Sequence, residues 1–293
     1  MELDINSFWI ILTGALVAVS CSMLGSFLVL RKMSMVGDAI SHAVLPGIVI
    51  AFLVSGSRST IPMLIGAAFF GILTTYLIET FNKKGRLQDD ASIGITFTWL
   101  FAIGVILITA FASNVDLDQD CVLYGEIAYV PLDLWYLDDG SDLGPRSVWI
   151  SGAVLLYIFA LVFFAYRKLF ITTFDPAYAA AIGISTMFWH YLLMSSVSLV
   201  TVVSFESVGA ILVVAFLIAP AATAYLLTEQ LPKMLGLSAV FGVLAAFFGY
   251  ILASFLDSSI AGAMTTVLGV EFLLVFLWVA FVKPLFYKKK QIV

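Results

Sequence analysis

Residues 8–30 read FWIILTGALVAVSCSMLGSFLVL, a run of 23 residues without a charged side chain. About 20 helical residues cross the roughly 30 Å hydrocarbon core of a bilayer, so this run is long enough to span a membrane. A segment in lipid must satisfy its backbone hydrogen bonds internally, and the alternating pattern of outer-membrane strands is absent here. The run is therefore predicted to be a transmembrane helix.

The rest of the chain repeats this pattern. Of its 293 residues, 62% are hydrophobic and 11% are charged, a balance outside the range of soluble globular domains. The fold class is therefore all-α: a polytopic membrane bundle that forms a single transmembrane domain over residues 1–293. The two runs on either side of Glu206 could pack as one broken hairpin, which would leave eight spans, but the apolar runs favour nine: 8–30, 33–54, 61–80, 91–113, 148–167, 186–205, 207–228, 234–256 and 259–282.

Lysine and arginine predict the orientation of the bundle, because they concentrate in cytoplasmic loops. With the N-terminus outside, twelve of the fourteen basic residues fall on the cytoplasmic side and only Arg58 and Arg146 fall outside. The acidic start, MELDINSFW, lacks the basic region of a signal peptide, so the first run is expected to be a retained span. We expect a multi-pass protein of the inner (cytoplasmic) membrane with a cytoplasmic C-terminus.

The external loop, about 114–147, contains eight acidic residues and one basic residue. It is either a solvated acidic loop, an attractive field at the mouth of a cation path, or a docking surface for a partner. Asp116, Asp118 and Asp120 resemble the start of a calcium-binding loop. Such a loop needs glycine at its sixth position and glutamate at its twelfth, whereas this chain has Cys121 and Ile127 there. A calcium-binding loop is therefore not expected.

Asp38 and His42 are ionisable residues within the second predicted span, which is otherwise mostly apolar. They are four residues apart and so share one helix face, with their Cβ atoms about 5 to 6 Å apart. Counting about 1.5 Å per residue from Lys32, Asp38 is about 9 Å deep and His42 about 15 Å deep. Ionisable residues at such depth usually face a water path or the bundle interior. The pair is predicted to lie on an ion path, the alternative being a hydrogen bond that joins two helices.

Two prolines add to this prediction. Pro46 lacks an N–H, so it leaves the carbonyl of His42 without its helical partner, and the adjacent Gly47 allows a bend or a close helix approach. Pro220 similarly frees the carbonyl of Phe216, although this pattern alone is more often a simple kink. We expect Pro46, Gly47 and Pro220 to be helix breaks that line the path.

Three other ionisable residues occur in or near spans. Glu206, at the outer end between two spans, is a candidate metal ligand at the entry, or else a solvated interfacial acid. His190 lies among aromatic residues near the inner surface, which favours interfacial packing over metal binding. Glu271 lies deep in the last span, and no motif explains it.

The cytoplasmic segment of about 172–184 is short and can form a small helix capped by Asp175, with Pro176 at its first position. This helix is either a docking element for a partner or a simple connector. The chain contains no G-x-x-x-x-G-K-[ST] motif, so any ATP hydrolysis is expected in a separate subunit and the chain itself is not expected to be an enzyme.

Three stretches of the chain resemble, in order, signatures of one protein family. RKMSMVGDAISHAVLPGIVIAF (31–52), FDPAYAAAIGI (174–184) and VGAILVVAFLIAPAATA (208–224) are similar to the permease subunits of bacterial ATP-binding-cassette importers of manganese, zinc and iron. The resemblance covers nearly the whole chain, and DLDQDCVLYGEI (116–127) looks more like the manganese and iron branch.

The resemblance implies that Asp38 and His42 line or ligate the path of a transported divalent metal, with manganese first and iron or zinc as alternatives. No permanently bound cofactor is expected. It also implies that a coupling helix sits in a groove of the ATPase; its residues include Phe174, Asp175, Pro176, Ala179 and Gly183. The expected partners are cytoplasmic ATPase subunits, a second permease subunit (identical or paralogous) and an extracytoplasmic metal-binding protein, with no nucleic acid.

Two other classes of function are the alternatives to an ATP-driven permease. In a proton-coupled secondary metal transporter, Asp38 and His42 would form a proton relay and uptake would not need an ATPase. In an intramembrane enzyme, Ser41 and His42 would be a nucleophile and its base, but adjacent residues point about 100° apart on a helix and do not form such a pair. The ATP-driven metal permease is the favoured hypothesis.

Overall fold

The computed structural model describes residues 4–56, 60–111, 127–136 and 142–282. Within these residues, nine helical spans are long and apolar enough to cross a membrane, which confirms the predicted fold class and its nine spans. The second span consists of two helices, and the elements that form the spans are α1 (Ile5–Leu30), α2 (Met35–Ala43) with α3 (Leu45–Ser55), α4 (Thr60–Gly85), α5 (Asp89–Phe111), α7 (Arg146–Phe174), α9 (Thr186–Val208), α10 (Ala210–Leu227), α11 (Leu231–Leu256) and α12 (Ile260–Leu277).

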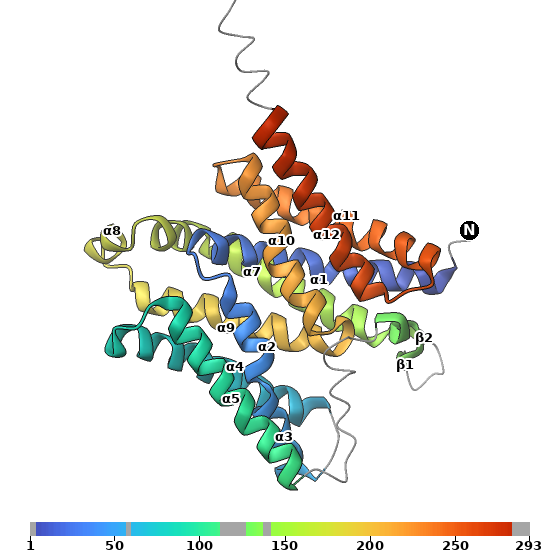
Figure 1. The fold of residues 1–293 in the computed structure, drawn as a ribbon, viewed down its shortest axis with the longest axis horizontal. Helices are drawn as coiled ribbons and strands as arrows, with labels where there is room; N and C mark the ends of the chain where they lie inside the picture. The colour runs from blue at the N-terminus through green and yellow to red at the C-terminus, as the bar shows by residue number, and fades with distance from the viewer. Residues whose placement is uncertain (1–3, 57–59, 112–126, 137–141, 283–293) are drawn as a thin grey trace, which may run out of the picture.

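Short elements mark the two ends of the bundle (Figure 1). At one end, called the α8 end below, α8 (Pro176–Ala181) connects α7 to α9. At the opposite end lie the 3₁₀ helix η1 (Ile127–Leu132) and an antiparallel hairpin of β1 (Leu134–Tyr136) and β2 (Asp142–Pro145). A π-helical turn, η2 (Trp278–Val282), follows α12.

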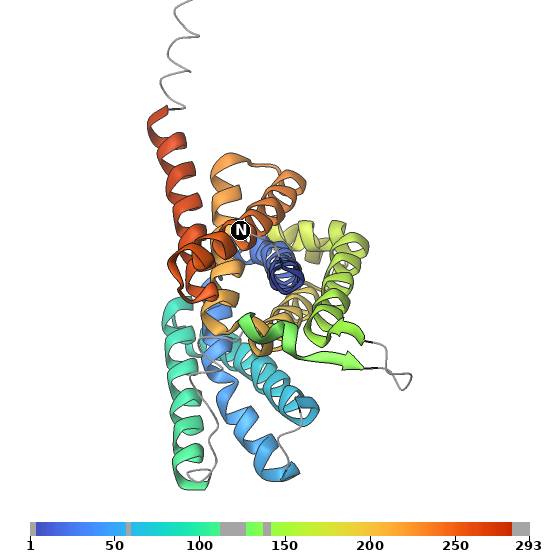
Figure 2. The same ribbon diagram turned by 90° about the vertical axis from the view of Figure 1, so that its right-hand side faces the viewer.

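Helix α1 is the centre of the larger part of the bundle. It packs against α7, α9, α10 and α11, and Figure 2 shows it nearly end-on with later helices around it. Its side chains Leu24, Phe27 and Leu28 are completely buried. Helices α2 to α5 form a second group beside it, in which α5 packs on α2 and α3 while α4 packs on α9. The α2–α3 span therefore lies where the two groups meet.

Glycines allow helices to approach at backbone distance. A Cβ atom on Gly25 of α1 would lie 1.8 Å from the Leu217 carbonyl oxygen of α10, and one on Gly47 of α3 would lie 2.4 Å from the Gly66 carbonyl oxygen of α4. In lipid, helices associate mainly through such close packing, because lipid tails are as apolar as leucine. The close helix approach expected at Gly47 is confirmed.

The chain has two joints between consecutive helices. The first is at Val44, between α2 and α3, where the backbone stays nearly helical (φ −76°, ψ −17°). This break in the second span lies about one turn before Gly47, the residue at which a bend was expected. Between α9 and α10, Gly209 has φ 80° and ψ 160°, a left-handed conformation that favours glycine. Because this joint separates two helices that are each long and apolar enough to cross a membrane, the described residues favour nine spans over eight.

Candidate functional site

Asp38 and His42 meet on one face of α2, as their spacing predicts. The His42 Nε2 atom lies 3.6 Å from Asp38 Oδ1. The two side chains are about one third exposed, 35% for His42 and 38% for Asp38, although they belong to a membrane-spanning segment. A gap of 3.6 Å is compatible with one transition-metal ion bound to both atoms, since metal–oxygen and metal–nitrogen bonds are about 2.0 to 2.2 Å long.

Two phenylalanines of α5 hold the His42 ring. The ring centroids of Phe97 and Phe101 lie 5.9 and 5.7 Å from that of His42, and the Phe101 ring meets it edge-on. Packing of this kind fixes the orientation of the imidazole and limits the freedom that it would lose on binding an ion. The sequence did not identify these two residues, because they come from a helix distant in the chain.

Pro46 and Gly47 lie in the first turn of α3, one turn from His42, and both are buried. Pro46 has no N–H with which to bond the His42 carbonyl. Gly104 of α5 makes room for the proline, since a Cβ on this glycine would lie 3.0 Å from Pro46 Cδ. The structure therefore brings the carboxylate, the imidazole and the proline break together within one short segment.

Pro220 is buried inside α10. One turn earlier, the Leu217 side chain lies against α2, because a Cβ on Gly37 would be 2.9 Å from Leu217 Cδ1. The proline-containing part of α10 is thus next to the helix that carries Asp38.

Other predicted residues stay untested. The side chain of Glu206 lies outside the described part of the structure, as do residues 114–126 and 137–141 of the acidic loop 114–147. Glu271 of α12 has one buried carboxylate oxygen, Oε2, without a hydrogen-bond partner among the described residues. In the described part of the chain, no group of three or more His, Cys, Asp or Glu side chains lies close enough to share one metal ion. Asp38 and His42 thus form an open two-residue pair there.

The expected coupling segment contains a helix, α8, shorter than the predicted 172–184 because residues up to Phe174 continue α7. Asp175 caps α8, accepting a hydrogen bond of 2.8 Å from the Tyr178 N–H, and Pro176 occupies its first turn. Gly183 follows the helix with φ 82°. The predicted local chemistry of the cap is confirmed.

Helix α8 has a buried side and an exposed apolar side. Ala179 is completely buried, while large hydrophobic side chains around the helix are about half exposed: Phe174, Tyr178, Ile182, Met187 and Phe188. A short helix with such a surface, next to basic residues, is suited to bind a protein partner.

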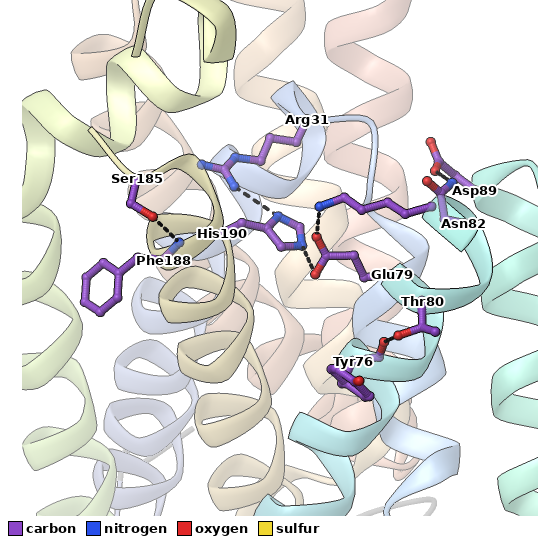
Figure 3. Close-up of polar contacts among 10 residues, drawn as sticks. Arg31, Tyr76, Glu79, Thr80, Asn82, Asp89, Ser185, Phe188 and His190 are labelled. Carbon is purple, nitrogen blue, oxygen red and sulfur yellow. Dashed lines mark hydrogen bonds and ion pairs between the residues drawn. The ribbon is translucent and has the colours of Figure 1, made fainter. Parts of the chain in front are cut away.

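A polar network at the α8 end was not predicted from the sequence (Figure 3). Arg31, at the end of α1, contacts His190 Nδ1 of α9 at 3.5 Å, and His190 Nε2 lies 3.8 Å from Glu79 Oε2 of α4. Lys83, one turn after Glu79, also pairs with that carboxylate. The spacing of Glu79 and Lys83 was the available signal, since opposite charges four residues apart interact on a helix. His190 therefore takes part in a polar network as well as packing with aromatic residues.

Comparison with known proteins agrees with this architecture. The family model described as the ABC 3 transport family matches residues 5–280. The chain is 50% identical over 270 residues to the manganese transport system membrane protein MntD of Bacillus subtilis, covering 92% of this chain and 91% of that protein. It is 41% identical over 274 residues to the zinc transport system membrane protein TroD of Treponema pallidum, covering 92% and 73%.

A solved structure has the same fold. It is described as PsaBC from Streptococcus pneumoniae in complex with Fab, and it superimposes with a TM-score of 0.75 at 34% sequence identity, covering 93% of this chain and 91% of that one. The nine spans and these relatives identify a multi-pass protein of the cell membrane. With the family match extending over nearly all of its length, the chain belongs to the ABC 3 transport family.

Proposed function

We propose that this chain is the permease subunit of an ATP-driven importer of a divalent transition metal. The main support is the Asp38 and His42 pair, an oxygen and a nitrogen donor 3.6 Å apart within a membrane-spanning segment. A charged side chain within a bilayer is costly, about 3 kcal/mol for an aspartate at the centre of a helix, and ionisable residues in spans usually belong to a transport path. The family membership of the chain supports the same activity.

The donor chemistry supports the choice of cargo. A carboxylate and an imidazole suit manganese, ferrous iron or zinc, and do not provide the thiolates that select copper. Relatives named for manganese and for zinc transport make manganese the first candidate and zinc the next. An open pair of ligands supports weak binding, which transport requires because the ion must leave again.

The energy source in this proposal is a separate cytoplasmic ATPase. The α8 end, with its basic residues and its exposed apolar side chains around α8, is assigned to the cytoplasm. Helix α8 and its flanking residues Phe174, Asp175 and Gly183 then dock on the ATPase, whose closure moves α8 and exposes the Asp38 region first to one side and then to the other. An extracytoplasmic metal-binding protein delivers the ion to the opposite end.

A second permease subunit completes the path. One third of the Asp38 and His42 side chains is open at the surface of the single chain, and lipid cannot solvate a carboxylate there. A second copy or a paralogue that covers this face would enclose the pair in a polar path.

The proposal is tested with the chain purified with its ATPase and reconstituted in liposomes. We expect manganese uptake that requires ATP and is lost, at least about tenfold, in Asp38→Ala and His42→Ala variants that still bind the ATPase; tenfold corresponds to about 1.4 kcal/mol. Wild-type uptake in both variants would contradict the assignment of the site. Uptake that persists without ATPase and collapses with the proton gradient would favour the secondary transporter instead.

A further inference from the structure

A cavity of about 420 Å³, lined by both apolar and charged side chains, opens at the α8 end. Residues from several elements line it, among them Arg31 after α1, Val36 of α2, Glu79 of α4 and Thr172 of α7. Val36 comes two residues before Asp38, so the cavity lies next to the segment that carries the proposed metal ligands. The cavity is therefore placed where a movement at α8 can reach that segment.

Arg31 makes three hydrogen bonds across this region. Its Nε donates to Thr173 Oγ1 at 3.0 Å and its Nη2 to Thr172 Oγ1 at 3.2 Å, both in the last turn of α7. Its Nη1 donates to Nδ1 of His190 at 3.5 Å (Figure 3), so the neutral imidazole carries its proton on Nε2, the nitrogen that faces Glu79. One side chain thus connects α1, α7, α9 and, through His190, α4.

The position of Arg31 in the chain determines which two segments these bonds connect. It follows the last residue of α1, and α2 begins four residues later at Met35. Its partners Thr172 and Thr173 precede Asp175, the cap of α8. The side chain therefore joins the segment just before α8 to the segment just before α2.

The charged side chain of Arg31 has only neutral hydrogen-bond partners among the described residues. The guanidinium is partly buried, and among the described residues no carboxylate lies within 4 Å of it. Burial lowers the pKa of Arg31 to about 10, so it stays charged at neutral pH. Its hydrogen-bond partners are two neutral hydroxyls and an imidazole, which are weaker acceptors than a carboxylate and are exchanged more easily.

We propose that Arg31 is a positioning residue that transmits the movement of α8 to α2. When the ATPase displaces α8, the last turn of α7 moves with it, and the Arg31 bonds to Thr172 and Thr173 carry this displacement to the start of α2. The inference rests on the proposed function, since it needs an ATPase that acts on α8. A purely structural role would instead change folding or assembly and leave the coupling of ATP hydrolysis to uptake unchanged.

The experiment uses the permease and ATPase complex in liposomes, with manganese uptake and ATP hydrolysis measured together. Thr173→Val keeps the shape of the side chain but removes the acceptor, while Thr173→Ser retains it. Arg31→Lys retains the charge but not the planar fork of donors. Thr266→Val is the matched control, because Thr266 is exposed on α12 and its hydroxyl bonds only its own helix, at the Gly262 carbonyl.

We expect Thr173→Val and Arg31→Lys to lower the amount of manganese imported per ATP by about fivefold, the effect of one net hydrogen bond. The KM for manganese should not change, because the metal ligands are untouched, and Thr173→Ser and Thr266→Val should match the wild type. If Arg31→Lys fails to assemble, Thr173→Val still decides the outcome.

Wild-type coupling in Thr173→Val and in any assembled Arg31→Lys complex would overturn the inference. A raised KM at normal coupling would also overturn it, since it would assign Arg31 to metal binding. Absence of ATP-dependent manganese uptake in the wild-type complex would instead contradict the proposed function, so the two failures are distinguishable.

Discussion

At the scale of single residues, Pro46 has no N–H to bond the carbonyl of His42, and in the proposed path this leaves the carbonyl available to an ion. In Pro46→Ala an N–H returns, and it can bond this carbonyl as in a regular helix. We expect the KM for manganese to rise about tenfold, the equivalent of about 1.4 kcal/mol. Uptake kinetics of the reconstituted complex measure the change.

The matched control for this substitution is Pro232→Ala. Pro232 lies in the first turn of α11, where a backbone N–H has no helical partner in any case. Replacing this proline should therefore leave the KM for manganese unchanged. Equal KM values in Pro46→Ala and the wild type would show that the His42 carbonyl does not take part in transport.

Residues that are neighbours within one helix could be predicted from the sequence. The contact between Asp38 and His42 follows from their spacing of four, and the Asp175 cap follows from its position before Pro176. The packing of Phe97 on His42 could not be predicted, because in lipid the apolar pattern does not indicate which face of a helix is buried. The bond from Arg31 to Thr173 likewise depends on the lateral order of helices, which one sequence does not contain.

At the scale of elements, α3 and α4 are held together by direct backbone packing at Gly47. The methyl group in Gly47→Ala would lie 2.4 Å from the Gly66 carbonyl oxygen. Neither the Cβ atom nor the carbonyl oxygen can rotate away from its own backbone, so the two helices would have to separate. We expect a loss of about 1 to 3 kcal/mol of stability, the usual effect of overpacking, and a lower melting temperature of the purified complex.

Gly152→Ala is the control for this prediction. A Cβ on Gly152 of α7 meets no atom within 4 Å, and alanine favours the helix, so the melting temperature should stay equal or rise. A Gly47→Ala complex with the melting temperature of the wild type would mean that α3 and α4 can move apart without a loss of stability.

Helix ends were harder to predict than helices. Charged residues marked the expected ends of the third and fifth spans at 80 and 167, but α4 continues to Gly85 and α7 to Phe174. Charged side chains end the membrane-buried part of a helix, not its hydrogen bonding, so helices extend into water. The hairpin of β1 and β2 was not predicted, since it lies within a loop identified only by its charge.

At the scale of the whole molecule, the open face of α2 predicts the composition of the active complex. Because the Asp38 and His42 side chains are about one third exposed, we expect a transport-active complex to contain two permease chains that face each other across this pair. Native mass spectrometry of the complex in lipid nanodiscs measures the number of chains. An active complex with a single permease chain would contradict the arrangement.

The same open face affects how the protein is made. In the proposed assembly, a newly inserted chain exposes about one third of the Asp38 and His42 side chains until its partner covers them, and a charged carboxylate within a bilayer is costly. This cost makes the unpaired subunit less stable in the membrane than the assembled one, so we expect it to have the shorter lifetime. A paralogous partner would therefore have to be made in a matching amount, whereas an identical partner comes from the same synthesis.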